Sequence, residues 1–472
     1  MLKNKLLLNF FSSGLQAIAV QVLGSIFFYI ISIYLSKEIF GLINWMNAVC
    51  LFLITFLGFG LEQVVTRRIA ASPRSDWAAA AFFAHSIIGF LIAFLLLLML
   101  SLFIKDQASV FKFLPWFFVA QGFIYMGVPL KQFLNAKERF TPYGIIAAVS
   151  NAAKIVIAFL LQQHHNLNIR TVIFTLICTA GFEIVYLVFY ILTKTTFSFK
   201  LHFKAYTKLL RESSAQYLSV IFDMSLSRMD WILVGIITSN VVLADYSFAY
   251  RAFELARLPV FIIGPMLLPR MARLMSSNNK PGVMQQQEIN SFITVEVSVA
   301  VLILLILNIL WVPVITSITN GKYGNTNSLQ FLVLSLCIPL QFFINLLWSL
   351  TFSAKKYKSV SLITVVCAVT NIVLNLILIS KFNGLGAAAA FFITALLQGY
   401  LYYKLVSKEI MRISLRPLLL LIGAAVVYFI AMRITTNFLI QLAIAVVLYL
   451  LIAVLSGQLT RRQFLNFKQF LS

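Results

Sequence analysis

The chain is patterned as a series of long apolar runs, most of about 20 residues or more, separated by short polar or basic segments. A helix rises about 1.5 Å per residue, so about 20 apolar residues cross the ~30 Å hydrocarbon core of a membrane. The pattern therefore predicts an all-α polytopic membrane protein with about fourteen transmembrane helices. The predicted spans are 15–35, 42–62, 77–103, 113–135, 143–163, 170–193, 213–238, 243–270, 289–318, 327–353, 359–380, 384–405, 416–434 and 437–456.

The composition excludes a soluble protein. Of the 472 residues, 61% are hydrophobic and only 11% are charged, against about 25% charged residues in an ordinary soluble domain. The four cysteines lie singly inside apolar runs, without the spacing of a zinc site or a disulfide framework. No metal and no cofactor is therefore expected.

The formal charge of +23 reflects membrane topology. If both termini are cytoplasmic, 25 of the 37 Lys and Arg lie in cytoplasmic loops or at the cytoplasmic ends of spans, 7 lie in the opposite loops or span ends, and 5 lie deeper within spans. Cytoplasmic loops of membrane proteins carry such an excess of Lys and Arg. The sequence thus predicts cytoplasmic termini and no nucleic-acid partner. The loops on the other side are too short to hold a catalytic domain.

Two parts of the chain resemble each other. The stretch SSGLQAIAVQVLGSIFF at Ser12 has a counterpart at Ser213, and NAKERF at 135–140 is echoed by SAKKYK at 353–358. This repeat predicts two six-helix lobes, which suggests alternating access. The predicted divisions are a first lobe at 1–193, an amphipathic cytoplasmic linker at 194–212, a second lobe at 213–405, and helices 13 and 14 with a basic cytoplasmic tail at 406–472.

Two segments resemble a known family. LNLILISKFNGLGAAAAFFITALLQGY at 374–400 and ADYSFAYRAFELARLPVFIIGPMLLPRMARL at 244–274 are similar to helices 11–12 and helix 8 of polysaccharide exporters in the multidrug/oligosaccharidyl-lipid/polysaccharide superfamily. The chain departs from the usual family turn at Asn383, before Gly384. The resemblance implies a V-shaped pair of lobes in the bacterial inner membrane.

The same resemblance implies a function. It suggests an O-antigen-type flippase that moves an undecaprenyl-diphosphate-linked oligosaccharide from the inner to the outer leaflet by alternating access. The partners would be the lipid-linked oligosaccharide, membrane lipids and a polysaccharide polymerase. Polar residues on late helices, among them Asn371 and Asn375, could meet the sugars.

Six charged residues lie away from the ends of the predicted spans 213–238 and 243–270, which are the seventh and eighth. A charge at the membrane centre costs about 3 kcal/mol or more unless it is paired or hydrated. If the two helices are antiparallel neighbours, residues of opposite charge lie at equal depth. Either these pairs hold the helices together, or some of the arginines bind a diphosphate in a hydrated cavity. The predicted pairs are Asp223 with Arg257, Arg228 with Glu254, and Asp230 with Arg251.

Further ionisable residues lie in other spans. Lys154 is a fourth candidate for diphosphate binding, and Glu183 lies at a depth that would allow a loose pair with it. Lys131 is near enough to the cytoplasmic end of its helix to reach water. Glu296 has no partner at equal depth and is a candidate proton-coupling group.

Two other functions are weighed against a flippase. A drug/cation antiporter of the same superfamily usually needs a carboxylate on the first helix, and residues 15–35 contain none. A membrane glycosyltransferase or polymerase would need a sizeable outer loop, which is missing. No GxxxxGK[ST] motif is present, so the sequence predicts a non-enzymatic transporter without direct use of ATP.

Overall fold

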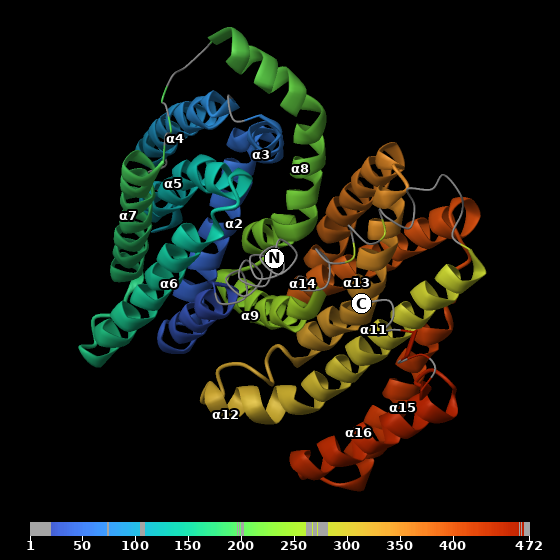
Figure 1. Ribbon diagram of the computed structural model, residues 1–472. Helices are drawn as coiled ribbons and strands as arrows, with labels where there is room; N and C mark the ends of the chain where they lie inside the picture. The colour runs from blue at the N-terminus through green and yellow to red at the C-terminus, as the bar shows by residue number, and fades with distance from the viewer. Residues whose placement is uncertain are drawn as a thin grey trace. The chain divides into compact units, whose positions relative to one another are not determined.

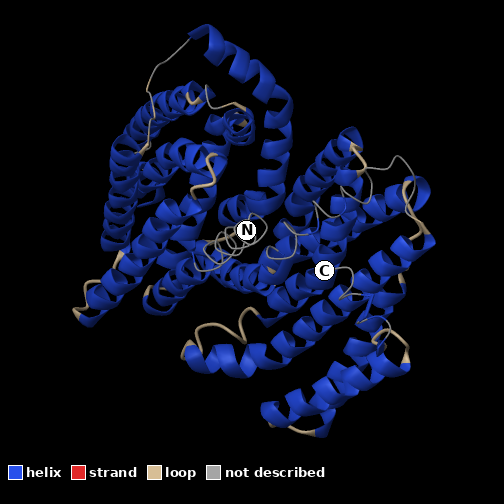
Figure 2. Cartoon of the chain, viewed as in Figure 1, coloured by secondary structure: helices blue, strands red, loops and turns tan. Residues whose placement is uncertain are grey.

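The computed structural model describes most of the chain, and all its regular elements are helices. It covers residues 20–72, 75–103, 109–195, 203–260 and 282–461, with positions 197, 199, 267, 271, 463, 465 and 466. Within these residues no strand occurs (Figure 2). The predicted all-α fold is confirmed.

Ten of the described helices are long and apolar enough to cross a membrane. One of them, α14 (Tyr357–Glu409), contains two predicted spans, because its backbone leaves the helical conformation at Asn383. The other predicted spans correspond to the helix Val20–Tyr34, α8 (Phe203–Ile237) and α9 (Asn240–Ala256), which are shorter or more charged. These helices account for the fourteen predicted segments, although part of 15–35 and of 243–270 falls outside the described residues.

Apolar side chains cover much of the helix surface. On α4 (Trp77–Phe103), Leu96, Leu102 and Phe103 are all more than half exposed. Lipid is the solvent that suits such side chains. The chain is a multi-pass membrane protein.

The first of two compact units is Met1–Ala244. In it α5 is central, because it packs against α2, α3, α4 and α7, while α6 packs on α7 and α8 packs on α2 and α3 (Figure 1). The elements not yet delimited are α2 (Lys37–Gly58), α3 (Leu61–Ala71), α5 (Ser109–Ala136), α6 (Phe140–Gln163) and α7 (Ile169–Lys194).

The second compact unit is Asp245–Ser472. Here α13 packs against both α11 and α14, and α15 packs with α16 against α11. The two last helices are the extra C-terminal pair that the sequence predicts. The elements are α11 (Val283–Leu310), a π-helical turn (Trp311–Ile315), α12 (Thr316–Ile318), α13 (Ser328–Ser353), a 3-10 turn (Arg416–Leu419), α15 (Leu420–Ile434) and α16 (Phe438–Leu455).

Helix α8 begins inside the predicted linker. It runs without interruption for 35 residues from Phe203, so the second half of the 194–212 segment and the predicted span 213–238 form one helix. The lobe boundaries inferred from the internal repeat stay a prediction, because the two compact units are defined by contacts rather than by repetition.

Short polar caps begin several of the helices. Asn168 accepts hydrogen bonds from the backbone N–H groups of Arg170 and Thr171 at the start of α7, and Asn437 accepts one from Leu439 at the start of α16. The first N–H groups of a helix have no partner within the helix. These caps satisfy such groups near the membrane surface, where the connections are only a few residues long.

The turn within α14 depends on a close backbone approach. Asn383 adopts φ 53°, and three residues later Gly386 lies so near the preceding helix that an added Cβ would be 2.1 Å from the carbonyl oxygen of Leu378. A side chain could not fit there. This contact requires glycine at position 386.

A similar approach on α2 leads to a prediction. At Gly41 an added Cβ would lie 1.8 Å from the carbonyl oxygen of Asn240. Gly41→Ala is expected to destabilise the protein by about 2 kcal/mol, as overpacking does elsewhere, and to lower the melting temperature in detergent. Gly282→Ala is the control, because nothing lies within 4 Å of its Cβ position. Equal melting of the two variants would contradict the prediction.

Candidate functional site

Three ionisable side chains gather between α5, α6 and α7. The ammonium group of Lys131 forms an ion pair with the Glu183 carboxylate, with an N–O distance of 2.5 Å. Lys154 donates a hydrogen bond to the Asn151 side-chain oxygen at 3.4 Å, and it lies within electrostatic range of both Glu183 and Lys131. In the described part of the chain Lys154 forms no salt bridge.

This arrangement adds a contact that the sequence did not predict. The lysine at hydrogen-bond distance from Glu183 is Lys131, while Lys154 interacts with Glu183 only at longer range. The physical reason is that α5 packs directly against α7, which a comparison of depths along the chain does not reveal. Two cations and one anion leave the cluster with one net positive charge, carried by a lysine whose hydrogen-bond acceptor is neutral.

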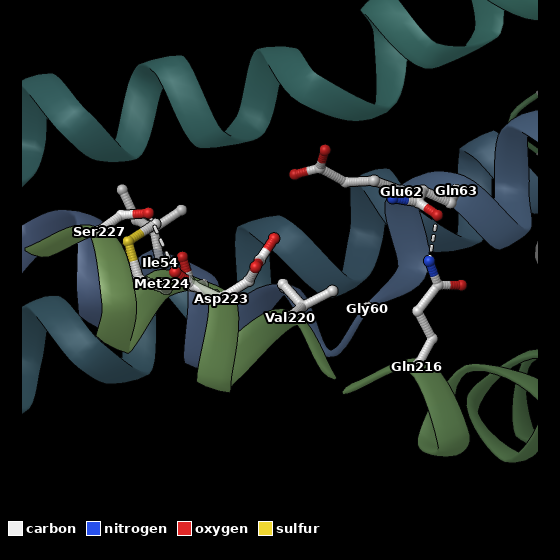
Figure 3. Close-up of a pocket in the computed structure, with 11 residues that line it drawn as sticks. Ile54, Gly60, Glu62, Gln63, Gln216, Val220, Asp223, Met224 and Ser227 are labelled. Carbon is white, nitrogen blue, oxygen red and sulfur yellow. Dashed lines mark hydrogen bonds between the residues drawn. The ribbon is translucent and has the colours of Figure 1, made fainter. Parts of the chain in front are cut away.

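A pocket of about 320 Å³ lies in the first unit, where α2 and α3 face α8 (Figure 3). Its lining includes two carboxylates, Glu62 on α3 and Asp223 on α8, and no basic residue. Gln216 donates a hydrogen bond to Gln63 across the pocket. Such a lining can attract a cation, and its carboxylates, amides and hydroxyls can accept hydrogen bonds from one.

The shape of this pocket depends on the turn between α2 and α3. Gly60 adopts φ +67°, and a Cβ there would lie 3.1 Å from the backbone nitrogen of Tyr217 on α8. Glycine is therefore needed both for the positive φ and for the close approach. The turn places Glu62 at the second position of α3, beside the pocket.

The charged residues of α8 have different surroundings. Asp223 is exposed at the pocket, whereas Asp230 is 2% exposed and accepts a hydrogen bond from the backbone N–H of Trp231 at 2.8 Å. The guanidinium of Arg228 donates to the Ser227 carbonyl oxygen at 3.1 Å and lies 4.8 Å from the centre of the Trp231 ring. Cation–π contacts of this kind favour a guanidinium in an apolar setting.

Arg251 on α9 and Arg257, the residue after α9, each contact a side chain of that helix. Arg251 forms an ion pair with Glu254, one turn further on, at 2.9 Å. The guanidinium of Arg257 lies 5.1 Å from the centre of the Phe253 ring. The three predicted pairs would join residues of different compact units, and they stay predictions.

Glu296 is enclosed in the second unit. It is 4% exposed, and neither carboxyl oxygen has a hydrogen-bond partner among the described residues. All residues from 291 to 298 are buried, so α11 is covered on every side at this level. A charged carboxylate is unfavourable in such a place without a partner.

The polar residues predicted to meet sugars bond to one another instead. Asn375 donates to the Asn371 side chain at 2.9 Å, and Asn371 donates to Thr394 at 3.2 Å across the two halves of α14. Both asparagines are 1% exposed or less. In this structure they form a buried network rather than the wall of a passage.

Sequence reasoning missed the polar side of the α2–α3–α8 pocket. Glu62, Gln63 and Gln216 lie at the ends of apolar runs, where polar residues are expected at a membrane surface. Only the approach of α8 to α3 brings them together. Among the described residues, no group of three His, Cys, Asp or Glu side chains is placed to hold a metal ion.

Comparison with protein families identifies a matching family. Residues 6–275 match the sequence model of the family described as "Polysaccharide biosynthesis protein". This match covers more than half of the 472 residues. No curated protein sequence matches the chain.

Solved structures share the fold at low sequence identity. A lipid II flippase, MurJ, in an inward closed conformation has a TM-score of 0.72 and 17% identity, covering 94% of this chain and 98% of its own. An inward-facing multidrug resistance MATE transporter has a TM-score of 0.67 and 11% identity, covering 82% and 94%. A superfamily transporter from Pyrococcus furiosus has a TM-score of 0.60 and 10% identity, covering 84% and 95%. These likenesses establish a fold found in flippases and drug transporters.

Proposed function

Because the chain belongs to the polysaccharide biosynthesis protein family, we propose that it is a flippase for a lipid-linked oligosaccharide. Its substrate would be an undecaprenyl-diphosphate-linked repeat unit of O-antigen or a related surface polysaccharide. The protein would carry this lipid from the inner to the outer leaflet by alternating access. Support comes from the family match and from the fold, which it shares with a protein titled as a lipid II flippase.

The observation that carries the proposal is the charge of the cluster between α5, α6 and α7. Lys131 and Glu183 neutralise each other, which leaves Lys154 as a cation inside a span with only a neutral acceptor. An uncompensated charge in a membrane segment is a mark of function. A diphosphate moving past this helix would supply the missing anion.

The proposal extends to three arginines on α8, on α9 and directly after α9. Arg228, Arg251 and Arg257 are further candidates for diphosphate binding, since a guanidinium can donate two parallel hydrogen bonds to phosphate oxygens. Arg251 would exchange its Glu254 partner for the substrate. Asp223, Asp230 and Glu183 would hold cations in place or take part in coupling.

The proposal is tested by removing the protein and then supplying it in pure form. A deletion strain should accumulate the lipid-linked oligosaccharide on the cytoplasmic leaflet and lose surface glycan. Purified protein in vesicles should move a labelled lipid-linked oligosaccharide to the leaflet where an external probe reaches it. Normal surface glycan in the deletion strain, together with inactive vesicles, would overturn the proposal.

A cation antiporter is the second candidate, and the acidic pocket favours it. Glu62 and Asp223 face a pocket with no basic residue in its lining, which suits an exchanged proton or an organic cation. If this candidate is correct, deletion increases sensitivity to cationic drugs and leaves lipid-linked glycans unchanged. The two candidate functions therefore predict different phenotypes for the same deletion strain.

Glu296 is proposed as a proton-coupling residue of the flippase. Because it is enclosed without a described partner, the neutral acid is the form that suits its site. Glu296→Gln preserves shape and neutrality, so the variant is expected to melt like the wild type. Its transport rate should no longer respond to a proton gradient. Glu288→Gln on the same helix is the control, and a wild-type response in Glu296→Gln would contradict the coupling role.

The proposed function also implies a cellular location, an orientation and a partner. We expect a non-enzymatic protein of the bacterial inner membrane, with cytoplasmic termini and transfer of its product to a polysaccharide polymerase. The charge asymmetry of the loops supports this orientation. Reporter fusions after Arg74 and Arg211 should be cytoplasmic and one near Lys105 should be external; the reverse pattern would contradict the orientation.

A further inference from the structure

A second pocket, of about 410 Å³, lies within the second unit and is polar. Three segments form it: the beginning of α11, the connection that leads to α15, and the residues that follow α16. The sequence predicts that all three lie at the cytoplasmic face. Residues that the pocket presents include Gln287, Asn290, Arg416, Gln458 and Asn466.

Hydrogen bonds between these segments hold the walls in place. The Asn290 side chain donates to the Arg412 carbonyl oxygen at 3.2 Å and accepts from the Ser414 backbone N–H at 3.0 Å. Asn466 donates to the Ser291 hydroxyl at 3.2 Å. The connection and the C-terminal segment are thus both tied to α11. The pocket is a built feature rather than a gap between loose ends.

The polar groups of the pocket suit an anion. Its lining contains one charged residue, Arg416, and no carboxylate; Glu288 of α11 is not among the lining residues. In the described part of the chain, the side chains of Arg416 and Gln458 make no hydrogen bond or ion pair. Gln458 is only 9% exposed and lines the pocket. A guanidinium and an amide are suitable donors for a phosphate.

The pocket borders an apolar surface. Leu455 immediately precedes the lining residue Ser456 and is 84% exposed, and Leu419, one turn after Arg416, is 61% exposed. Val283 and Met284 at the start of α11 are exposed to a similar degree. A polar hollow beside exposed apolar side chains matches an amphiphile, whose headgroup fills the hollow while its acyl chains lie along the helices.

We propose that this pocket binds the phosphate-bearing headgroup of an anionic membrane phospholipid. One cation and several hydroxyl and amide groups match a headgroup of single negative charge that carries hydroxyls, such as phosphoglycerol. Basic pockets at the cytoplasmic ends of helices bind lipid headgroups in this way. The bound lipid would hold α15 and α16 against α11. None of the residues that line this pocket is among the proposed diphosphate-binding residues, so the proposal does not depend on the transported molecule.

Lipid binding to the full chain in detergent tests the site. The probes are phosphatidylglycerol, phosphatidylcholine, inorganic phosphate and undecaprenyl diphosphate, with binding followed by native mass spectrometry and by melting temperature. Phosphatidylglycerol should bind and raise the melting temperature more than the other three. Arg416→Gln should weaken its apparent affinity by about tenfold, as expected for loss of a charge-assisted hydrogen bond. Gln458→Leu should weaken it as well.

Arg433→Gln is the matched control, because Arg433 lies at the other end of α15 and outside the pocket. Its binding should equal that of the wild type. The proposal is overturned if Arg416→Gln melts normally and binds phosphatidylglycerol as the wild type does. It is also overturned if phosphatidylcholine or inorganic phosphate binds equally well, or if undecaprenyl diphosphate is preferred. Because none of these measurements uses transport, their failure is distinct from failure of the flippase proposal.

Discussion

Replacing Lys154 by glutamine is expected to reduce glycan export by at least about tenfold without unfolding the protein. The Lys154 ammonium group lies in a membrane span and donates a hydrogen bond to Asn151, whereas Glu183 forms its ion pair with Lys131. Removal of the Lys154 ammonium group therefore breaks no salt bridge in the described residues. A hydrogen bond between charged groups contributes about 1.5 to 3 kcal/mol, which corresponds to a tenfold or larger loss if the diphosphate is the partner.

The measurement combines surface glycan with the amount of protein in the membrane. Lys154→Arg keeps the positive charge and should retain much of the export. Lys112→Gln is the control, because Lys112 is an exposed lysine near the beginning of α5. Full export by a normally expressed Lys154→Gln variant would exclude diphosphate binding by this lysine.

The second large effect concerns the ion pair that holds α5 to α7. Glu183→Gln is expected to destabilise the protein by about 3 kcal/mol, because it leaves Lys131 without its counterion in the membrane. The side chains of Lys131 and Glu183 are 23% and 11% exposed, so little water is available to compensate. The melting temperature in detergent should fall clearly below that of the wild type.

A double variant tests whether the lost stability comes from the unpaired charge or from lost packing. Lys131→Met combined with Glu183→Leu removes both charges and keeps apolar volume, so it should recover most of the lost stability. If the double variant is less stable than Glu183→Gln alone, the unpaired charge of Lys131 is not the cause of the lost stability, and the prediction is wrong. Surface glycan measured in the same variants would show whether the pair also serves transport.

The first unit illustrates what sequence reasoning can and cannot place. The depths of Lys131, Lys154 and Glu183 follow from their positions in apolar runs. The partner of Glu183 does not, because three helices of similar composition offer no sequence signal for which two are neighbours. The same holds for Glu62 and Asp223, which are 161 positions apart and meet only because α8 packs on α3.

Local structure was easier to foresee than local chemistry. The sequence indicated a turn between two spans at Asn383, and the structure shows a positive φ at Asn383 and, at Gly386, a close approach that only glycine allows. Asn371 and Asn375 were predicted to face sugars, yet they hydrogen bond within α14. Residue type indicates that a buried polar group needs a hydrogen-bond partner, whereas the fold decides which residue is that partner.

The sequence by itself determined the all-helical membrane fold and the fourteen apolar segments, and it placed the ionisable residues within spans. Hydrophobic length and the requirement that every backbone group be hydrogen-bonded in lipid act on each segment separately. Only the tertiary structure decided that Lys131 neutralises Glu183, that two carboxylates share a pocket, and that the segment after α16 closes a polar hollow on α11. These outcomes depend on which helices pack together, and packing joins residues that the chain separates by tens to hundreds of positions.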